Sequence, residues 1–509
     1  MEKIVVKGGV PLNGTVEISG MKNAALPIIF ACVLVKDKCY IENVPNVRDV
    51  SFALDILRSL GASIKTINKT TLEIDCTDIE CGDAPYELVS QMRASYYLLG
   101  AELGRFSYAK VALPGGCDFG PRPIDQHIKG FEALGGTVTN EGGYVEINAP
   151  DGIGGANIFF DRVTVGATAN LMIAAAISDG VTVIDNAARE PHIVDLANFL
   201  NTCGARISGA GTDMIKIRGV KELHGCTYTI IPDMIEAGTF MIAAAATEGR
   251  VRINNIIPKH LESITAKLQE IGVSVQEFDD YLIVSRKGKL SKTRIKTLPY
   301  PGFPTDMHPQ MTVLLCLADG VSFISEGVYE NKRFRYVDEL ARMRADIKVD
   351  VHTAVIEGGK PLSAAPVRAV DLRAGVALVI AGLVCSGETE ITDIFRIERG
   401  YDDIVGKLKS LGANIRKVIV PEKIDIKKQI ETQNEKGNKK MTVTKKSLIG
   451  DILDNEIETA QFFLEIGMHC LGCPASRGET IEEACEVHGT DADELVNKIN
   501  EFLESKESK

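Results

Sequence analysis

The segment over residues 113–127, Leu-Pro-Gly-Gly-Cys-Asp-Phe-Gly-Pro-Arg-Pro-Ile-Asp-Gln-His, concentrates residue types that do chemistry. Its glycines and prolines surround Cys117, and they favour a loop over a helix or a central strand. Arg122 follows soon after, and a nearby cation lowers the pKa of a thiol and so favours the reactive thiolate. A free cysteine is more often a small buried hydrophobe. Because the charged residues Asp118 and Asp125 do not suit an apolar slot, we predict a reactive thiol here.

The composition is that of a globular protein with about three domains. The chain has 509 residues, of which 45% are hydrophobic and 25% are charged. Its formal net charge of -12 argues against a general nucleic-acid binder. The chain lacks a run of roughly 18 apolar residues, as a membrane span requires, and its first residues lack the pattern of a secretory signal. We expect a cytoplasmic protein with mostly reduced cysteines, without nucleic-acid or membrane partners.

The chain repeats one pattern six times, at intervals of about 70 residues. In each copy a helix end is followed by a sequence of the type Gly-Ala-x-Ile, in which glycine suits the left-handed helix cap and the β-branched residue begins a strand. The copies lie at residues 60–64, 134–138, 203–207, 271–275, 343–347 and 411–415. A period of this length exceeds those of common solenoids and propellers, which are roughly 20 to 50 residues.

Helices rich in small residues precede several of the repeated strands. They are expected over residues 167–178, 238–247 and 310–318, each followed by a Gly-x-x-x-Ile strand. Helices that are apolar on all sides belong in the interior. The repeated unit of strand, helix, strand, helix and strands therefore predicts an α/β fold with sheets wrapped outside bundled helices.

Several short motifs point to one family. They are Gly20–Ala25, Gln91–Ser95, the loop around Cys117, Val165–Thr168, Asn186–Pro191, Phe303–Met307, Asp371–Arg373 and Arg399–Tyr401. From about Met1 to Val420, the chain resembles the enolpyruvyl transferases of peptidoglycan synthesis, the UDP-N-acetylglucosamine 1-carboxyvinyltransferases. The resemblance implies two inside-out α/β barrel-like domains, each with three repeated βαβ-type units, and an active site in the cleft between them. It places the domains at residues 22–230 and at residues 1–21 with 231–420.

The reaction implied by the resemblance moves an enolpyruvyl group from phosphoenolpyruvate to the 3′-hydroxyl of UDP-N-acetylglucosamine and releases phosphate. It requires cations for a phosphate and a carboxylate, a base for the hydroxyl proton, and an acid for the vinyl carbon. The implied reaction needs no organic cofactor. No metal site is expected in this part of the chain, because its histidines and cysteines lack the spacing of metal ligands.

The resemblance assigns the catalytic roles to Cys117, Asp306, Lys22 and Arg399. Cys117 is the expected general acid, which can carry a covalent adduct and is the residue that fosfomycin alkylates in the family. Asp306 is the expected base, although an aspartate before a helix could equally be its N-cap. Asp371 carries the same ambiguity. Lys22 precedes an apolar helix, whose N-terminus favours anions.

The binding residues implied by the resemblance form two overlapping sets. Arginine suits phosphate and carboxylate because its planar fork bonds two oxygens at once. The phosphoenolpyruvate set is Lys22, Asn23, Arg93, Arg122, Asp371, Arg373 and Arg399. The UDP-sugar set is Asn23, Arg93, Arg122, Asp125, His127, Arg162, Val165, Gly166, Asp306 and Val328.

Two positions depart from the family pattern. Arg162 stands where many relatives carry lysine, which preserves the charge but changes the geometry. The segment over residues 330–334 carries one extra residue, and within it we select Arg333 as the arginine of the site.

The C-terminal part does not follow the family. Residues 421–440 form a polar linker, and residues 441–509 predict a small all-helical domain with helices over 447–467, 480–488 and 491–503. Between the first two helices, Cys470 and Cys473 form a CxGC pair. The region resembles a small helical domain associated with hybrid-cluster proteins and thought to be redox-active. The pair fits a redox disulfide, half of a metal site completed by Cys485, His469 or His488, or inert packing.

Two other functions compete with this one. The first is transfer of the same group to shikimate 3-phosphate, which the loop around Cys117 argues against. The second is a catalytically weak paralogue that senses redox state or binds a partner through its CxGC tail. The presence of Lys22, Cys117, Asp306 and Arg399 argues against lost activity.

Overall fold

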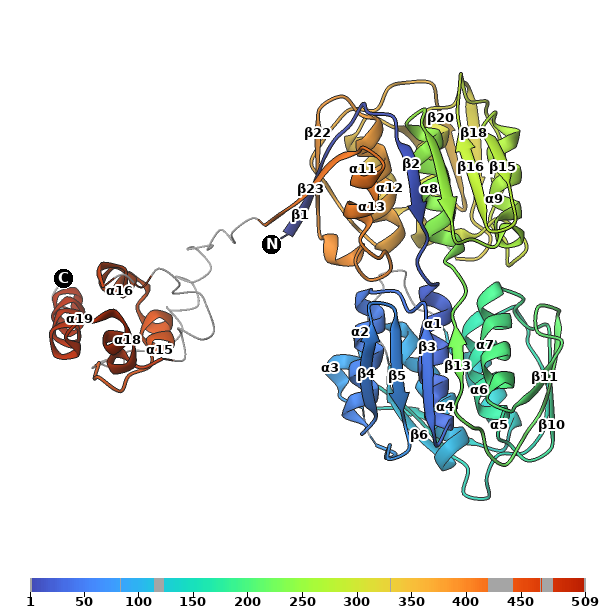
Figure 1. Ribbon diagram of the computed structural model, residues 1–509, viewed down its shortest axis with the longest axis horizontal. Coiled ribbons are helices and arrows are strands. Elements are labelled where there is room, and N and C mark those ends of the chain that lie inside the picture. The colour runs from blue at the N-terminus through green and yellow to red at the C-terminus, as the bar shows by residue number, and fades with distance from the viewer. Residues whose placement is uncertain are drawn as a thin grey trace. The chain divides into compact units, whose positions relative to one another are not determined.

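The computed structural model describes residues 2–82, 84–113, 123–329, 331–419, 443–466, 468 and 479–507. The chain divides into two compact units, residues 1–420 and residues 421–509. Within the first unit, the described strands form six sheets. Three of these sheets make up a first lobe and three make up a second lobe (Figure 1).

The sheets of the first lobe use strands from residues 38–229. In spatial order they are β13 (Thr227–Thr229), β3 (Lys38–Glu42), β5 (Thr71–Asp75) and β4 (Ser63–Asn68); β6 (Tyr108–Ala112), β8 (Tyr144–Asn148) and β7 (Thr137–Glu141); and β11 (Arg206–Ser208), β12 (Met214–Arg218), β10 (Val181–Asp185) and β9 (Asn157–Phe159).

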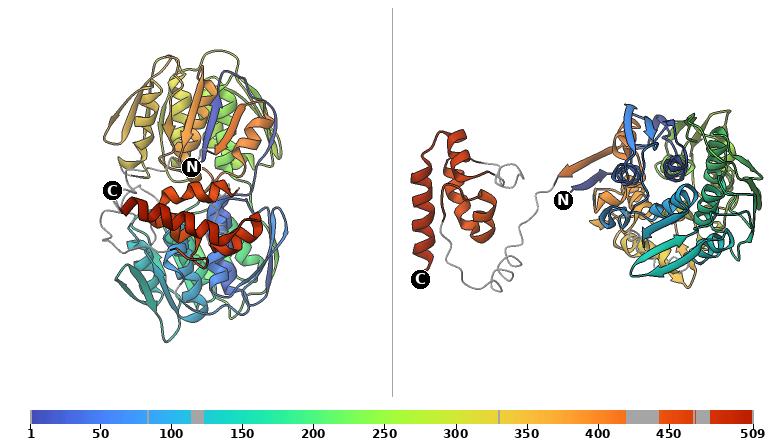
Figure 2. Two further views of the ribbon diagram at one scale, coloured as in Figure 1. Left: turned by 90° about the vertical axis from the view of Figure 1, so that its left-hand side faces the viewer. Right: turned by 90° about the horizontal axis from the view of Figure 1, so that it is seen from below.

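The sheets of the second lobe combine strands from both ends of the first unit. In spatial order they are β21 (Val367–Arg368), β22 (Glu388–Thr392), β1 (Glu2–Lys7) and β23 (Asn414–Ile419); β15 (Ser274–Glu277), β16 (Tyr281–Ser285), β14 (Arg250–Asn254) and β2 (Asn13–Glu17); and β17 (Arg294–Lys296), β18 (Val321–Ser325), β20 (Thr353–Glu357) and β19 (Asp346–Asp350). The N-terminal strands, dark blue, lie among later ones in Figures 1 and 2.

The register shows how the repeat is built. Each four-stranded sheet has three strands in antiparallel pairs and one parallel edge strand, such as β9 beside β10 or β17 beside β18. In three of these sheets the edge strand (β9, β17 or β21) leads into a buried helix, which leads into the neighbouring strand. The edge strands β2 and β13 instead lead into buried helices of the other lobe. Because a parallel neighbour requires a crossover, the buried helix is the natural connection.

The central helices of both lobes are apolar on nearly all sides. They are α1 (Lys22–Ala31), α4 (Tyr97–Phe106), α6 (Val165–Ala175), α8 (Met234–Ala246), α10 (His308–Cys316) and α12 (Leu372–Val384). Every residue of α8 is buried, and α4 packs against α6 as α10 packs against α12. The predicted arrangement of sheets outside bundled helices is thus confirmed.

The remaining helices are amphipathic or short. They are α2 (Arg48–Ser59), α3 (Tyr86–Val89), α5 (Asp125–Ala133), α7 (Pro191–Thr202), α9 (Pro258–Glu270), α11 (Tyr336–Arg342) and α13 (Ile404–Ser410), with 3₁₀ turns at Cys32–Leu34, Arg93–Tyr96, Thr305–Met307, Asn331–Arg335 and Ile394–Arg396. A long helix such as α9 buries one side against the lobe and exposes the other, as its burial pattern shows.

The six predicted helix ends share one conformation. Five of them carry a glycine in the left-handed region, for example Gly61 at φ 104° and Gly272 at φ 98°. In the fifth copy Arg344 takes the same role at φ 65°, where a side chain is tolerated at a cost in strain.

Two segments cross side by side between the lobes, and we call residues 18–21 and 230–233 the hinge. Gly20 forms a bridge with Pro232, and the Met21 N–H donates to the Ile231 carbonyl at 2.7 Å. A Cβ on Gly20 would lie 1.6 Å from the Asn43 carbonyl oxygen, so only glycine allows this approach.

A buried ion pair anchors the hinge to the second lobe. The Glu236 carboxylate accepts a hydrogen bond from the Ser19 N–H at 2.8 Å and pairs with Lys407. Burial raises the pKa of Glu236 to about 7, although Lys407 acts in the opposite direction.

The second unit has a hydrophobic core of its own, which includes Ile449, Phe463 and Ile499. Its helices are α15 (Ile449–Asn455), α16 (Ala460–Glu465), α18 (Ile481–His488) and α19 (Ala492–Glu507), with a 3₁₀ turn at Ile457–Thr459. The prediction of one helix over residues 447–467 is wrong. The chain becomes extended at Glu456, and the described part of this stretch contains two short helices.

Cys470, Cys473 and His469 lie outside the described residues. Cys485 is buried within α18, and His488 ends that helix. Across the described part of the chain, no helix combines the length and the hydropathy needed to cross a bilayer.

Candidate active site

Three charged side chains meet where the two lobes touch. The Lys22 Nζ lies 3.0 Å from Asp49 Oδ2, and the Arg399 Nε lies 2.8 Å from Asp49 Oδ1. Lys22 begins α1 and Asp49 lies in the first turn of α2, whereas Arg399 belongs to the second lobe. Burial favours the neutral acid, but the two cations outweigh it and lower the pKa of Asp49. Asp49 therefore holds together two of the predicted catalytic cations.

A second charged group surrounds Asp306. Its Oδ1 lies 3.0 Å from Arg333 Nη2, and its Oδ2 lies 2.9 Å from Arg373 Nη2 and 3.0 Å from Arg373 Nε. Both arginines are almost fully buried. Burial acts to raise the pKa of Asp306, but Arg373 and Arg333 lower it below its ordinary value. Asp306 is thus ionised at neutral pH.

The two ambiguous aspartates differ in the structure. The Asp371 side chain caps α12 and accepts hydrogen bonds from the N–H groups of Arg373 and Ala374 at 2.8 and 2.9 Å. Asp306 precedes α10 but bonds to arginines and makes no described capping bond. The N-cap reading therefore holds for Asp371 and fails for Asp306.

Among the described atoms, the buried Nη1 of Arg373 has no hydrogen-bond partner. It belongs to the guanidinium that binds Asp306. A buried charged donor without an acceptor is costly, and an anionic ligand would satisfy it.

The two groups of charges lie close enough to influence each other. Lys22 contributes to the lowered pKa of Asp306, and both Arg373 and Lys22 act on buried Asp233. Gly400 lies beside both groups, because a Cβ there would be 3.4 Å from Lys22 Cδ and 2.8 Å from the Leu372 side chain. Cations from both lobes thus gather around two carboxylates.

The first lobe adds a smaller group of predicted site residues. His127 is buried, its ring lies 6.0 Å from that of Tyr96, and Gly166 lies against it. Burial and the charge of Arg93 lower the pKa of His127 to about 3, so the ring is neutral. The Arg93 guanidinium lies 5.7 Å from the Tyr96 ring centroid.

Other predicted residues lie outside the charged groups. Asp125 begins α5 and pairs with Arg162, and both side chains are about half exposed. Val165 begins α6, Asn23 follows Lys22 in α1, and Val328 is exposed after β18. No described contact joins these five residues to Asp306.

Cys117 and Arg122 lie outside the described residues, and their predicted roles stay predictions. The described chain ends beside them at Leu113, whose N–H donates to the Gly143 carbonyl at 2.7 Å, and resumes at Pro123 before α5.

Sequence reasoning missed Asp49. In the sequence it is an ordinary acidic residue in the first turn of an amphipathic helix, which the helix dipole alone would explain. Its partner Arg399 is 350 residues away. Because this contact depends on how the two lobes meet, only the fold reveals it.

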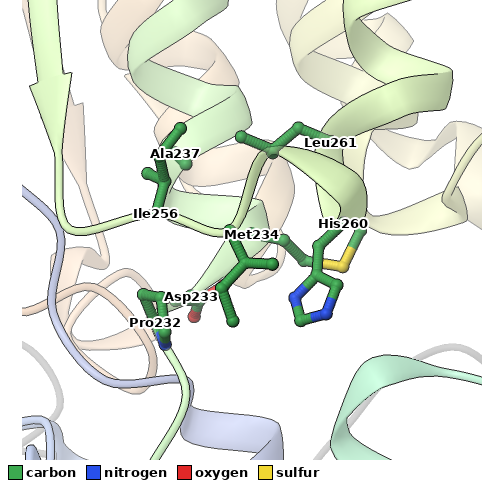
Figure 3. Close-up of a pocket in the computed structure, with 8 residues that line it drawn as sticks. Pro232, Asp233, Met234, Ala237, Ile256, His260 and Leu261 are labelled. Carbon is green, nitrogen blue, oxygen red and sulfur yellow. The ribbon is translucent and has the colours of Figure 1, made fainter. Parts of the chain in front are cut away.

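A small pocket lies beside the hinge in the second lobe (Figure 3). It is lined by Pro232, Asp233, Met234, Ala237, Ile256, Ile257, His260 and Leu261. It leaves practically no room for a water-sized sphere, whereas ligand pockets usually measure roughly 300 to 1,000 Å³, so it is too small for a sugar nucleotide. We assign it no ligand.

The family models match two parts of the chain. Residues 6–408 match EPSP synthase (3-phosphoshikimate 1-carboxyvinyltransferase). Residues 443–496 match a domain of unknown function (DUF1858).

Relatives align along the whole first unit. The chain is 54% identical over 418 residues to UDP-N-acetylglucosamine 1-carboxyvinyltransferase 3 of Caldanaerobacter subterraneus, which covers 82% of this chain and 100% of the relative. It is 56% identical over 416 residues to UDP-N-acetylglucosamine 1-carboxyvinyltransferase of Clostridium botulinum, covering 82% and 99%.

Solved structures share the two-lobed fold. The enolpyruvyl transferase NikO from Streptomyces tendae has a TM-score of 0.75 at 25% identity, covering 82% of this chain and 99% of that chain. EPSP synthase from Acinetobacter baumannii has a TM-score of 0.66 at 16% identity, covering 82% and 100%, which is a likeness of fold. The chain therefore belongs to the enolpyruvyl transferase family, and it is a transferase.

Proposed function

We propose that the chain transfers the enolpyruvyl group of phosphoenolpyruvate to the 3′-hydroxyl of UDP-N-acetylglucosamine and releases phosphate, as in peptidoglycan synthesis. One observation carries the proposal. Lys22, Arg373 and Arg399 converge from both lobes around ionised Asp49 and Asp306. This is the charge pattern that a substrate with a phosphate and a carboxylate requires.

The reaction needs two proton transfers in its first step. The 3′-hydroxyl oxygen bonds to C2 of phosphoenolpyruvate while C3 gains a proton, which gives a tetrahedral intermediate. We assign the hydroxyl proton to Asp306 and the proton at C3 to Cys117. In the second step C3 loses a proton, the C2–O bond to phosphate breaks, and the double bond returns.

Asp306 suits this role only if its arginine pairs weaken. A carboxylate held by Arg333 and Arg373 is a poor base, because both cations stabilise the ionised form. The carboxylate and phosphate of phosphoenolpyruvate would compete with Asp306 for Arg373. Binding of this first substrate would therefore free Asp306 to accept the hydroxyl proton of the second.

The relatives favour UDP-N-acetylglucosamine over shikimate 3-phosphate as acceptor. The chain is more than 50% identical, over nearly their whole length, to relatives named UDP-N-acetylglucosamine 1-carboxyvinyltransferase. In contrast, the solved EPSP synthase shares 16% identity. We further propose that the functional domains run over residues 22–230 and over residues 1–21 with 231–420.

The test measures phosphate release from phosphoenolpyruvate with each acceptor under reducing conditions. We expect release with UDP-N-acetylglucosamine, none with shikimate 3-phosphate, and loss of release after treatment with fosfomycin. Arg399→Gln should be strongly impaired, whereas the matched change Arg416→Gln, at an exposed pair with Glu388, should not be.

Two results would contradict the proposal. Phosphate release with shikimate 3-phosphate but not with UDP-N-acetylglucosamine would identify shikimate 3-phosphate as the acceptor. Absence of release with either acceptor would favour the catalytically weak paralogue. Cys117→Ala tests the acid separately, because it should slow release while leaving sugar-nucleotide binding intact.

A further inference from the structure

Three cysteines of the first lobe converge although they are far apart in the sequence. Cys39 lies in β3, Cys203 directly follows α7, and Cys226 directly precedes β13. Their Sγ atoms all lie within 4.8 Å of one another, and those of Cys203 and Cys226 are 3.4 Å apart. The expectation of no metal site rested on spacing along the sequence, which could not reveal this group.

Main-chain contacts fix the positions of the three residues. Strands β13 and β3 pair in parallel, and the Tyr40 N–H donates to the Cys226 carbonyl at 2.8 Å. The His224 N–H donates to the Cys203 carbonyl at 2.9 Å. The thiols therefore stay together without a bond between them, which makes the group preorganised.

The three cysteines of the group differ in their exposure to solvent. Cys39 and Cys203 are fully buried, whereas Cys226 is partly exposed and gives an ion access from solvent. The buried Cys32 thiol is close enough to Cys39 to interact with it.

We propose that Cys39, Cys203 and Cys226 bind a soft d¹⁰ metal ion, Cu⁺ or Zn²⁺, as thiolates. Thiolate sulfur selects these ions over hard cations such as Mg²⁺. Sulfurs bound to zinc at about 2.3 Å lie about 3.8 Å apart in a tetrahedron, so the observed separations need only small side-chain rotations. Each thiol gives up its proton to solvent as the metal–sulfur bond forms.

Cys32 distinguishes the two ions. Zinc in a structural site has four ligands, and Cys32 is the neighbouring thiol that could complete them. A three-thiolate site without it suits Cu⁺ better. The ion would tie β3, α7 and the segment before β13 together, and the chain enters the hinge directly after β13.

Two other readings of the group compete with metal binding. Buried cysteines can simply fill apolar space. A disulfide between Cys203 and Cys226 would require the sulfurs to approach from 3.4 Å to about 2.05 Å and an oxidant to take two electrons. In the reducing cytoplasm that the sequence predicts, thiols persist and remain open to a metal.

The test uses the full chain with Cys470→Ser and Cys473→Ser, which removes the pair in the tail. The protein is loaded anaerobically with Zn²⁺ or Cu⁺ alone, freed of excess ion, and analysed for metal per chain. We expect one retained ion, lost in Cys39→Ser and in Cys226→Ser. Cys385→Ser, at a fully buried cysteine in the second lobe, should keep it.

Because a core variant can misfold, a readout on the parent protein accompanies the variants. Co²⁺ loading should give the near-ultraviolet absorption of sulfur-to-metal charge transfer, at an intensity typical of at least three thiolates. Loss of Zn²⁺ but not Cu⁺ in Cys32→Ser would identify a four-thiolate zinc site. Retention of both ions in Cys32→Ser would identify the three-thiolate site.

Three results would overturn the proposal. One is a folded parent protein with titratable thiols that retains neither ion. Another is retention of the ion in both Cys39→Ser and Cys226→Ser. The third is loss of two thiols to a Cys203–Cys226 disulfide under the anaerobic reducing conditions of the assay.

Discussion

Asp49 and Asp306 both lie where the lobes meet, and each is held by two cationic side chains, yet their surroundings differ. The Asp49 side chain is 5% exposed and bridges cations from both lobes. The Asp306 side chain is 28% exposed and binds two arginines of the second lobe alone. Burial acts to raise both pKa values, and the cations lower both.

The comparison teaches that a shifted pKa does not by itself distinguish a reacting carboxylate from a structural one. Asp49 is enclosed, so its ion pairs position Lys22 and Arg399. Asp306 keeps an accessible side, as the base role proposed for it requires. Access to solvent separates their roles more clearly than charge does.

The largest expected effect comes from Asp306→Asn. An amide cannot take the hydroxyl proton, so we expect kcat to fall by about 10²- to 10⁴-fold. The measurement is steady-state phosphate release with both substrates. Asp319→Asn, at an exposed pair with Lys289, is the control and should leave kcat unchanged. A loss below tenfold would remove Asp306 from the role of base.

Asp49→Asn should act on stability first. Lys22 and Arg399 would lose the carboxylate that separates them, and breaking a buried ion pair costs about 3 kcal/mol. Urea unfolding measures this loss. Asp55→Asn on the same helix is the control, because its pair with Arg58 is exposed. Equal losses in the two variants would contradict a structural role for Asp49.

The pH dependence of the stability lost in Asp49→Asn gives a second test of the structural role of Asp49. The pKa of Asp49 is lowered in the folded state, so its contribution is present above the unfolded value of about 3.9. It is lost as the pH falls through the folded value. The stability difference between wild type and Asp49→Asn should therefore shrink on the acid side and stay constant above about pH 5.

The contribution of Glu236, which contacts the hinge, to the unfolding free energy should depend on pH in the opposite direction to that of Asp49. Its pKa is raised from 4.5 to about 7, so its contribution is fully present below pH 4.5 and is lost as the pH rises to about 7. Glu236→Gln should remove this slope from the unfolding free energy. The control is Glu248→Gln at a partly exposed pair with Arg286. An unchanged slope in Glu236→Gln would place the titration elsewhere.

The smallest effect is expected for Arg162→Lys, which introduces the lysine that the family resemblance implies at this position. Its pair with Asp125 is half exposed, and such pairs contribute roughly 0 to 1 kcal/mol. We expect unchanged stability and a change in the KM for UDP-N-acetylglucosamine of less than about fivefold. A larger change would give Arg162 direct contact with the sugar nucleotide.

Local sequence signals predict the architecture well, because each repeat carries its own cap and buried helix. Gly61 and Gly272 mark helix ends through backbone freedom that other residues lack. The prediction held even where Arg344 replaces glycine, since the surrounding repeat fixes the turn. It failed in the tail at Glu456, where an apolar pattern continued through a break in the helix.

Contacts between distant segments limit what the sequence predicts about the site. Motifs identify Lys22, Asp306 and Arg399 as site candidates, and in the structure each of them forms an ion pair. Asp49 and the group formed by Cys39, Cys203 and Cys226 carry no local signature, because their partners arrive from other strands or the other lobe.

The pairing of β1 imposes an order on synthesis. Ile4 aligns with Ile391 in β22, and Glu2 aligns with Ile419 in β23, so the first strand made waits for the last two. At ribosomal speeds of about 5 to 20 residues per second, this wait lasts roughly 20 to 80 seconds. The first lobe can close during that interval. On the ribosome, the N-terminal strand therefore waits unpaired while the whole sequence of the first lobe is made.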